Sequence, residues 1–322
     1  MSKNHLAHLS DFHVRYNSRQ EEYKIVLNRT IDDLKSIKPR RIVLAGDLFH
    51  TKINMSPTSV SIVGDFLSRL SEISPTDILI GNHDCSLTSL SQGDSITPII
   101  ELLPNGYIIT KENPELPIPK NHAHGIYYFK ESGFYNVDDE IIYGVYSMLD
   151  NEILSLTKKE KGKKYIALYH GPVFGAQMDN GYEAAGDSLI KPSVFNGFSA
   201  ALLGDFHTFQ VIQEYDEEKQ KPAIIFPGSL IQQNFGESID KGYVLWDLDN
   251  FSHERRFILN DYGYCRLNIY KGEIWEDRIQ DLKFSLNKKK TKIEIIIHDD
   301  KENYSVEKLS QIEKYIKDRH GC

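Results

Sequence analysis

The sequence has few cysteines, and their arrangement excludes two common uses of this residue. The 322-residue chain contains Cys85, Cys265 and Cys322, which are odd in number and widely spaced. Such spacing gives neither a disulfide framework nor a pair of zinc ligands. We therefore expect a reducing, intracellular setting, which covers the cytoplasm, the nucleus and the cytoplasm of an infected cell.

The sequence also lacks long apolar runs and an excess of positive charge. No stretch approaches the ~20 apolar residues that span a membrane. The opening residues, MSKNHLAHLSDFH, lack a signal-peptide core. We therefore expect neither secretion nor membrane insertion. The formal net charge of −8 argues against broad adhesion to nucleic acid, because Lys and Arg normally neutralise phosphate. Bound divalent cations or a partner subunit could supply the missing positive field.

The first part of the chain alternates apolar strand-like runs with helical patterns, and 40% of all residues are hydrophobic. This β-α-β-α-β alternation predicts a largely parallel sheet that is covered on both faces. Pro39 closes the first helical pattern, and Ser56-Pro57 opens the second. The predicted strands are 5–9, 42–45 and 77–80, and the predicted helices are 18–37 and one that starts at 56–57.

From Tyr107 onward, short apolar runs alternate with clusters of Gly, Pro, Asn and Asp. The runs YIIT, GIYYF, EIIYGVYSM, YIALYH and ALLGDFH predict strands of a second sheet, and AIIFPGS, GYVLWDL and RRFIL are further strand candidates. After Asn260 a smaller unit begins, with strands CRLNIY and IEIIIH and helices near 275–286 and 305–317. We therefore predict one domain over residues 1–260 and a second over residues 261–322.

Five predicted strand ends carry Asp, His or Asn side chains. One such residue alone usually caps a helix or binds a loop. Five together indicate a site, because strand ends of α/β sheets meet at one edge. The mixture of carboxylate, imidazole and amide groups suits ions such as Mn²⁺, and the lack of Cys argues against structural zinc. The motifs are Asp11-x-His13, Gly46-Asp47-x-x-His50, Gly81-Asn82-His83-Asp84, His170-Gly171 and Gly204-Asp205-x-His207.

This set of motifs resembles the calcineurin-like metallophosphoesterase superfamily, and within it the DNA-repair nuclease branch typified by SbcD and its phage and eukaryotic counterparts. His50 in GDLFH and the segments FPGSLIQQNFGES and KGYVLWDL carry the similarity to this branch. The resemblance covers roughly residues 1–260. It implies an α/β (α+β) fold, a four-layer αββα sandwich with a small C-terminal α/β capping domain. Relatives usually continue into an ATPase-docking segment, so we expect the capping domain to be truncated or short.

The resemblance implies two divalent metal ions, with Mn²⁺ preferred and Mg²⁺ as the alternative. Asp47 has two carboxylate oxygens and can bridge ions roughly 3.5 to 4 Å apart. The family normally has histidine where this chain has Asp205. Either Asp205 replaces that ligand or the second site is weakened, and we favour replacement because Asp binds hard ions well. The implied ligands are Asp11, His13, Asp47 and His207 for one ion, and Asp47, Asn82, His170 and Asp205 for the other.

The resemblance also implies roles for residues that are not ligands. His83 matches the catalytic histidine, which would stabilise the transition state or protonate the leaving oxygen. Asp84 is predicted either to orient His83 or to cap a following helix. His50 resembles a histidine that positions nucleic acid, and the alternative is a loop histidine bonded to backbone. Three residues that follow ligand motifs are predicted to contact DNA phosphates, namely Arg15, Lys52 and Asn54.

The implied activity is two-metal hydrolysis of DNA phosphodiesters. The branch acts as a Mn²⁺-dependent 3′-to-5′ exonuclease on duplex ends and as an endonuclease on hairpins and single strands. It works in DNA repair and recombination as a homodimer, with an SbcC-type SMC-like ATPase subunit. A small-molecule phosphodiesterase or nucleotidase of the same superfamily would share every ligand. A non-catalytic scaffold with a degenerate metal site is the other alternative, and Asp205 is the only residue that favours it.

Overall fold

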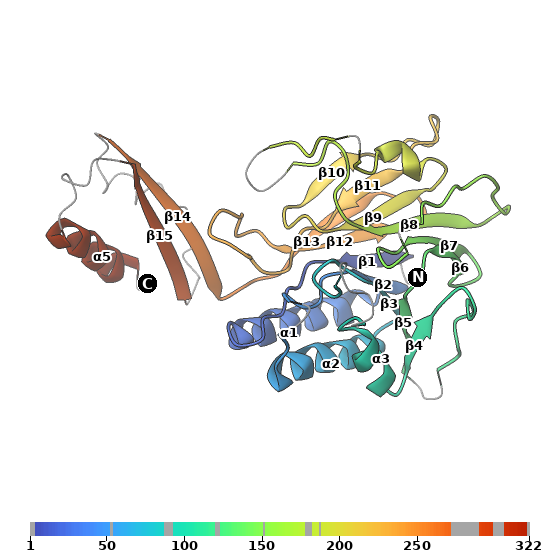
Figure 1. Cartoon of the computed structure of the whole chain (residues 1–322), viewed down its shortest axis with the longest axis horizontal. Helices are drawn as coiled ribbons and strands as arrows, with labels where there is room; N and C mark the ends of the chain where they lie inside the picture. The colour runs from blue at the N-terminus through green and yellow to red at the C-terminus, as the bar shows by residue number, and fades with distance from the viewer. Residues whose placement is uncertain are drawn as a thin grey trace. The chain divides into compact units, whose positions relative to one another are not determined.

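The computed structural model describes two compact units (Figure 1). The larger unit is built from residues 1–231 and 240–258, and the smaller one from residues 232–239 and 259–322. The predicted division after residue 260 stays a prediction. The residues that the structure describes are 4–51, 54–86, 93–119, 123–150, 152–177, 182–186, 188–271, 290–298 and 306–320.

Seven strands form the first sheet of the larger unit, in the order β13-β12-β1-β2-β3-β5-β4. Neighbouring strands pair in parallel along β1, β2, β3, β5 and β4. At the other edge, β12 pairs antiparallel with β1, and β13 pairs antiparallel with β12. Parallel strands place their carboxyl ends along one edge, where a site can form. The strands are β1 (His5–Leu9), β2 (Arg41–Ala45), β3 (Thr76–Leu79), β4 (Gly106–Ile109), β5 (Ile126–Phe129), β12 (Gly242–Asp247) and β13 (His253–Phe257).

Three helices cover one face of this sheet (Figure 1), namely α1 (Gln20–Ile37), α2 (Pro57–Ser71) and α3 (Thr97–Leu102). The helix α2 begins where the sequence predicts. Ser56 accepts a hydrogen bond from the backbone N–H of Ser59, and the Ser59 hydroxyl accepts one from the backbone N–H of Ser56. This reciprocal capping satisfies two backbone donors at the helix start. Among the described helices, none is both long and apolar enough to cross a lipid bilayer.

The second sheet has six strands in the order β10-β11-β9-β8-β7-β6 and packs against the uncovered face of the first. Leu6, Val43 and Leu79 of the first sheet belong to the same buried cluster as Tyr143 and Ile166 of the second. This cluster fixes the two sheets against each other. The strands are β6 (Gly133–Asn136), β7 (Ile141–Tyr146), β8 (Lys164–His170), β9 (Ala200–Gly204), β10 (Gln210–Gln213) and β11 (Ala223–Phe226).

The outer face of the second sheet is also covered. Leu154, Val173 and Phe195 pack on it from loops and from the short 3-10 helix η2 (Pro192–Phe195). The predicted α/β fold is confirmed as two mixed sheets with helices at their faces. In the described part of the chain, the outermost layer over the second sheet is made of η2 and loops rather than α-helices.

The assignment of two strands to the second sheet was wrong. The runs YIIT and GIYYF became β4 and β5, which extend the first sheet because β5 pairs in parallel with β3 and β4. The helix α3 provides the crossover that parallel pairing requires before β4. An apolar run shows that a strand is covered on both faces, but it does not show which neighbour the strand pairs with.

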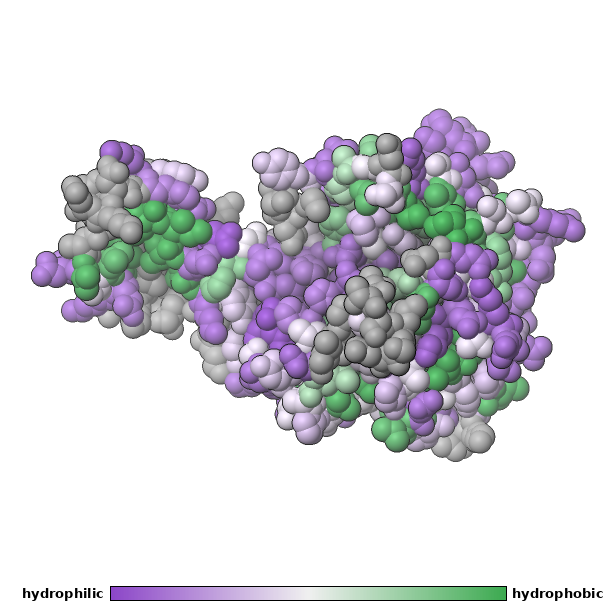
Figure 2. Space-filling view, in the orientation of Figure 1, coloured by the Kyte–Doolittle hydropathy of each residue, from purple (hydrophilic) through white to green (hydrophobic). Residues whose placement is uncertain are grey.

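The smaller unit pairs β14 (Tyr262–Tyr270) in parallel with β15 (Lys290–His298), and the helix α5 (Val306–His320) follows. Leu267, Ile269 and Ile312 form its buried cluster. Figure 2 shows hydrophobic surface on this unit, and isoleucines of β15 are only partly buried there. The predicted helix near residues 275–286 lies outside the described residues.

A buried ion pair within the first sheet of the larger unit accepts a hydrogen bond from the second sheet. The Arg41 guanidinium on β2 donates to both carboxylate oxygens of Asp77 on β3, over 2.7 Å from Nε and 2.5 Å from Nη2. The Tyr143 hydroxyl on β7 donates to the same carboxylate over 2.9 Å. All three side chains are buried. The pair is therefore fully hydrogen-bonded, which a buried charge requires.

We predict that Asp77→Ala lowers the free energy of unfolding by about 3 to 5 kcal/mol, because it leaves the Arg41 charge buried without its carboxylate. The control variant Tyr143→Phe removes one hydrogen bond and should cost about 1 kcal/mol. Urea denaturation followed by circular dichroism measures both changes. Equal losses in the two variants would show that the unpaired Arg41 charge costs no more than a single hydrogen bond.

Candidate metal centre

The polar strand ends meet at one edge of the larger unit. They come from three parallel strands of the first sheet and two of the second, so that segments far apart in the sequence converge. The groups are Asp11 and His13 after β1, Asp47 and His50 after β2, Asn82, His83 and Asp84 after β3, His170 at the end of β8, and Asp205 and His207 after β9.

Four of these residues have left-handed backbone conformations, which is uncommon for residues other than glycine. The φ angles are 56° at Asp11, 49° at His13, 55° at Asp47 and 107° at Asp205. Hydrogen bonds between loops hold them. The His13 N–H donates to the Asp47 carbonyl over 3.0 Å, and the Asp11 N–H donates to the Gly46 carbonyl over 3.2 Å. Strained backbone of this kind gathers at functional sites.

Asp47 lies between two groups of side chains. Its Oδ2 is 3.4 Å from His13 Nε2, and its Oδ1 is 3.5 Å from His170 Nε2. The backbone N–H of His83 donates to Oδ1 over 2.8 Å. The side chain is almost fully buried. Each carboxylate oxygen therefore faces a different imidazole, as a bridging ligand requires.

The first group contains two imidazole nitrogens that lie close together. His13 Nε2 and His207 Nε2 are 2.9 Å apart, and His13 Nε2 is 3.6 Å from Asp11 Oδ1. The potential ligand atoms of Asp11, His13 and His207 all lie within 4.8 Å of one another. Nitrogen and oxygen atoms converge in this way when they share a cation.

The second group has polar atoms that lack hydrogen-bond partners among the described residues. His170 Nδ1 donates to the Ala45 carbonyl over 2.6 Å, which leaves Nε2 directed at the carboxylates and without a hydrogen bond. The buried Oδ1 of Asn82 also has no partner, while its Nδ2 donates to Asp205 Oδ1 over 3.2 Å. Asp205 Oδ1 is 3.9 Å from His170 Nε2. Such an imidazole, anchored through its other nitrogen, is the usual state of a metal ligand.

The electrostatics of the cluster also indicate a cation. Burial lowers the pKa of His170, but the charges of Asp47, Asp11 and Asp205 raise it to about 10. The buried carboxylates thus need positive charge beside them, and a divalent ion supplies it in place of a proton. The donor set fits two divalent cations and is consistent with a dinuclear metal centre. Which ligand holds which ion stays a prediction.

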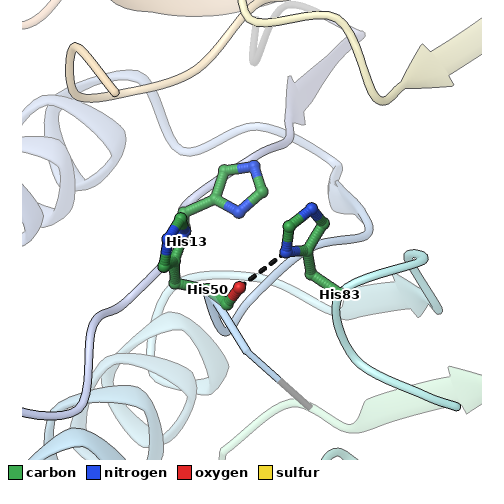
Figure 3. A group of neighbouring side chains, drawn as sticks. All are labelled: His13, His50 and His83. Carbon is green, nitrogen blue, oxygen red and sulfur yellow. Dashed lines mark hydrogen bonds between the residues drawn. The ribbon is translucent and has the colours of Figure 1, made fainter. Parts of the chain in front are cut away.

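The rings of His13, His50 and His83 form a cluster beside the first group (Figure 3). His83 Nδ1 donates to the His50 carbonyl over 2.6 Å, and the rings of these two residues stack with centroids 5.7 Å apart. Burial, and then the positive charge of Arg15, lowers the pKa of His50 to about 4. The His50 ring is therefore neutral at pH 7. The three imidazole rings could also hold a cation. The amount of metal bound by a His83 variant therefore tests whether His83 is a ligand or has the catalytic role predicted for it.

Among the described residues, the Asp84 carboxylate contacts the backbone of two loops, and the two roles predicted for it stay predictions. Its carboxylate accepts hydrogen bonds from three backbone N–H groups, of Leu48 over 3.2 Å, Phe49 over 3.0 Å and Gly81 over 3.1 Å. Burial and the nearby charge of Asp47 raise the pKa of Asp84 to about 7. Asp84 therefore ties the loop after β2 to the loop after β3.

Two of the three residues predicted to contact DNA lie in the described part of the chain. Arg15 is half-buried and close enough to His50 to lower its pKa. Asn54 is exposed, and its carbonyl accepts a hydrogen bond from the Thr51 hydroxyl over 3.1 Å. Lys52 lies outside the described residues. DNA contact by these residues stays a prediction.

Two segments noted only for their family resemblance hold the His207 loop. Lys241 Nζ donates to the His207 carbonyl over 2.8 Å, and the backbone N–H of Ser229 donates to the same oxygen over 3.1 Å. Lys241 is only 4% exposed. At Gly228, where φ is 75°, a Cβ atom would lie 2.8 Å from that carbonyl. The segments PGS and KG can be recognised in the sequence, but neither segment indicates which backbone atom its residues contact.

Comparisons with known proteins agree with this geometry. A profile of the calcineurin-like phosphoesterases matches residues 5–209. An uncharacterized protein of Acanthamoeba polyphaga mimivirus is 34% identical over an alignment of 323 positions, which covers 96% of this chain and 22% of that protein. The uncharacterized metallophosphoesterase YhaO of Bacillus subtilis (strain 168) is 27% identical over 211 residues, which are 65% of this chain and 45% of that protein. The chain thus spans less than half the length of either relative.

Among solved structures, the nuclease MPE of Pseudomonas putida is similar over 76% of this chain and 83% of its own. The sequence identity is 12% and the TM-score is 0.34.

We predict that Gly81→Ala abolishes binding of at least one metal ion, because the new Cβ would lie 2.1 Å from Asp47 Oδ1 and 2.3 Å from Asp47 N. Overpacking of this kind also costs about 1–3 kcal/mol of stability. Gly64→Ala in α2 is the matched control, since its Cβ would meet nothing within 4 Å. The control should keep full metal content and gain about 0.5–1 kcal/mol. Atomic absorption and urea denaturation measure both effects, and full metal content in Gly81→Ala would contradict the prediction.

We predict that Lys241→Met weakens Mn²⁺ binding roughly tenfold, because the lysine holds the backbone carbonyl of His207 and so fixes the position of this ligand. It should also lower stability by about 1.5–3 kcal/mol through loss of a charge-assisted hydrogen bond. Lys219→Met is the control, since Lys219 is 69% exposed and pairs with Asp216 on the surface. Isothermal titration calorimetry with Mn²⁺ compares the variants. An unchanged affinity in Lys241→Met would mean that the lysine is only structural.

Proposed function

The chain belongs to the calcineurin-like phosphoesterases, and we propose that this metal-dependent phosphoesterase is a nuclease of the SbcD type that cleaves DNA phosphodiesters with Mn²⁺. The observation that carries the proposal is the pair of stacked histidines, His50 and His83, beside the ligand groups. Protein phosphatases of the superfamily would carry a GDxVDRG motif where this chain has GDLFH. The neutral His50 ring adds a surface on which a nucleic acid can be positioned.

His83 is the residue we assign to proton transfer. Its Nδ1 N–H is used by the His50 carbonyl, so in the imidazolium form the Nε2 N–H is the group that can donate to a leaving oxygen or bind a phosphate oxygen. Its backbone N–H holds the Asp47 carboxylate over 2.8 Å. One residue therefore links the bridging carboxylate to the departing group. Divalent cations, when bound, supply Lewis acidity and an activated water.

We further propose that DNA repair and recombination is the setting and that the chain works with other proteins. Its net charge of −8 gives it little attraction for DNA by itself. A second copy of this chain and an SbcC-type SMC-like ATPase would supply the remaining grip. We propose 3′-to-5′ exonuclease activity on duplex ends and endonuclease activity on hairpins and single strands.

We predict that the chain degrades an end-labelled DNA duplex in the presence of Mn²⁺ and that His83→Ala slows cleavage by roughly 10²–10⁴-fold. Bound Mn²⁺ per chain should not change, because His83 is not assigned as a ligand. His124→Ala is the control, since His124 lies away from the strand ends that form the site. Gel analysis of the products and metal analysis of each variant give the two readouts.

Each outcome separates the alternatives. Failure to cut DNA together with rapid turnover of a cyclic nucleotide would identify a small-molecule phosphodiesterase instead. Loss of Mn²⁺ in His83→Ala would make His83 a ligand, within the group of three histidines. Absence of bound metal in the unaltered chain would identify a scaffold.

A further inference from the structure

We infer that the two cation sites are chemically unlike, and that Asp205 makes the site beside His170 one for a hard ion such as Mg²⁺. The site between His13 and His207 would instead retain Mn²⁺. The inference rests on the proposed two-ion centre, and it adds an identity for each ion. In solutions that contain both metals, the chain would hold a mixed pair.

The site between His13 and His207 is rich in nitrogen. Two imidazole Nε2 atoms lie 2.9 Å apart there, and Asp11 and Asp47 supply carboxylate oxygens 3.6 Å and 3.4 Å from His13 Nε2. Both Asp11 and His13 are buried. Imidazole ligands favour transition metals over Mg²⁺.

The site beside His170 is rich in oxygen. Among the described residues, His170 supplies its only imidazole, and the other groups are the Asp47 carboxylate 3.5 Å away, the Asp205 carboxylate 3.9 Å away, the Asp11 carboxylate and the amide of Asn82. Two buried atoms in this group, His170 Nε2 and Asn82 Oδ1, have no hydrogen-bond partner. His170 itself is only 2% exposed. These atoms indicate a ligand independently of the acidic residues.

Asp205 is held in place by both groups. Its backbone N–H donates to the two carboxylate oxygens of Asp11, over 3.2 Å and 3.1 Å, while its side chain accepts from Asn82 Nδ2. Because the Asn82 NH₂ group is used in this way, its carbonyl oxygen is the atom left for a cation. The Asp205 carboxylate therefore adds one oxygen to the site beside His170 and orients a second one, the Asn82 carbonyl oxygen.

The difference between the sites follows from ligand preference. Carboxylate and carbonyl oxygens suit Mg²⁺ and Mn²⁺ alike, whereas each added imidazole favours Mn²⁺. Mn²⁺ alone can then fill both sites. Mg²⁺ should compete at the oxygen-rich site and fail at the nitrogen-rich one.

The test is a Mg²⁺ titration of the full chain loaded with Mn²⁺, followed by electron paramagnetic resonance and metal analysis. With Mn²⁺ alone we expect two ions per chain and the spectrum of a coupled pair. Added Mg²⁺ should remove one Mn²⁺ and convert the spectrum to that of an isolated ion. In Asp205→His the same conversion should need at least about tenfold more Mg²⁺.

Two further variants keep the test decisive. Asp205→Asn keeps the shape of the side chain but removes its charge, and it should weaken binding of the second Mn²⁺, which supports the inference even if Asp205→His does not fold. Asp216→His is the control for an added histidine, because Asp216 lies in a separate loop and pairs with Lys219. It should titrate as the unaltered chain does.

Three outcomes would overturn the inference. They are equal displacement of both Mn²⁺ ions, identical Mg²⁺ competition in the unaltered chain and in Asp205→His, and binding of a single Mn²⁺ by the unaltered chain. The measurement uses no DNA, so a failed nuclease assay would leave the inference standing. Conversely, DNA cleavage by a chain with two equivalent ions would support the proposed function and refute only the inference.

Discussion

The rest of the site depends on the placement of the Asp47 carboxylate. Its two oxygens lie 3.4 Å and 3.5 Å from imidazoles that come from different sheets. This placement needs β2 in the middle of parallel strands, a left-handed backbone at Asp47, and a neighbour without a side chain at Gly81. The stacked second sheet then supplies His170 on the far side. The packing of the two sheets thus brings one group of side chains from each sheet to the same carboxylate.

Burial gives this arrangement its electrostatic character. Asp11 and Asp47 are almost completely buried, and His170 beside them is buried as well. Carboxylates removed from water are costly unless positive charge lies close by. Away from the site the fold meets the same requirement with Arg41 and Asp77. At the strand ends, the described contacts of the carboxylates include no arginine or lysine. Metal ions and histidines are therefore left to compensate the negative charge.

The sequence predicts the fold class and the convergence of the polar strand ends, but it does not predict the partner of every strand. Apolar runs that end in Asp, His or Asn are local patterns, and parallel strands bring them together without further information. Strand pairing is not local, and β4 and β5 were therefore placed in the wrong sheet. The role of Asp84 depends on backbone groups of two loops, and that of Lys241 on a carbonyl of a third. Contacts between side chains and distant backbone atoms leave no periodic trace in a sequence.

The left-handed backbone at Asp11, Asp47 and Asp205 has a consequence for how such a chain can change. Glycine would relax each of these turns, and asparagine tolerates them as well as aspartate does. A chain released from holding ions would become more stable through either replacement, so its turns would drift toward Gly or Asn. A charged, strained residue at each of the three turns therefore costs stability, which cations bound beside these carboxylates would offset.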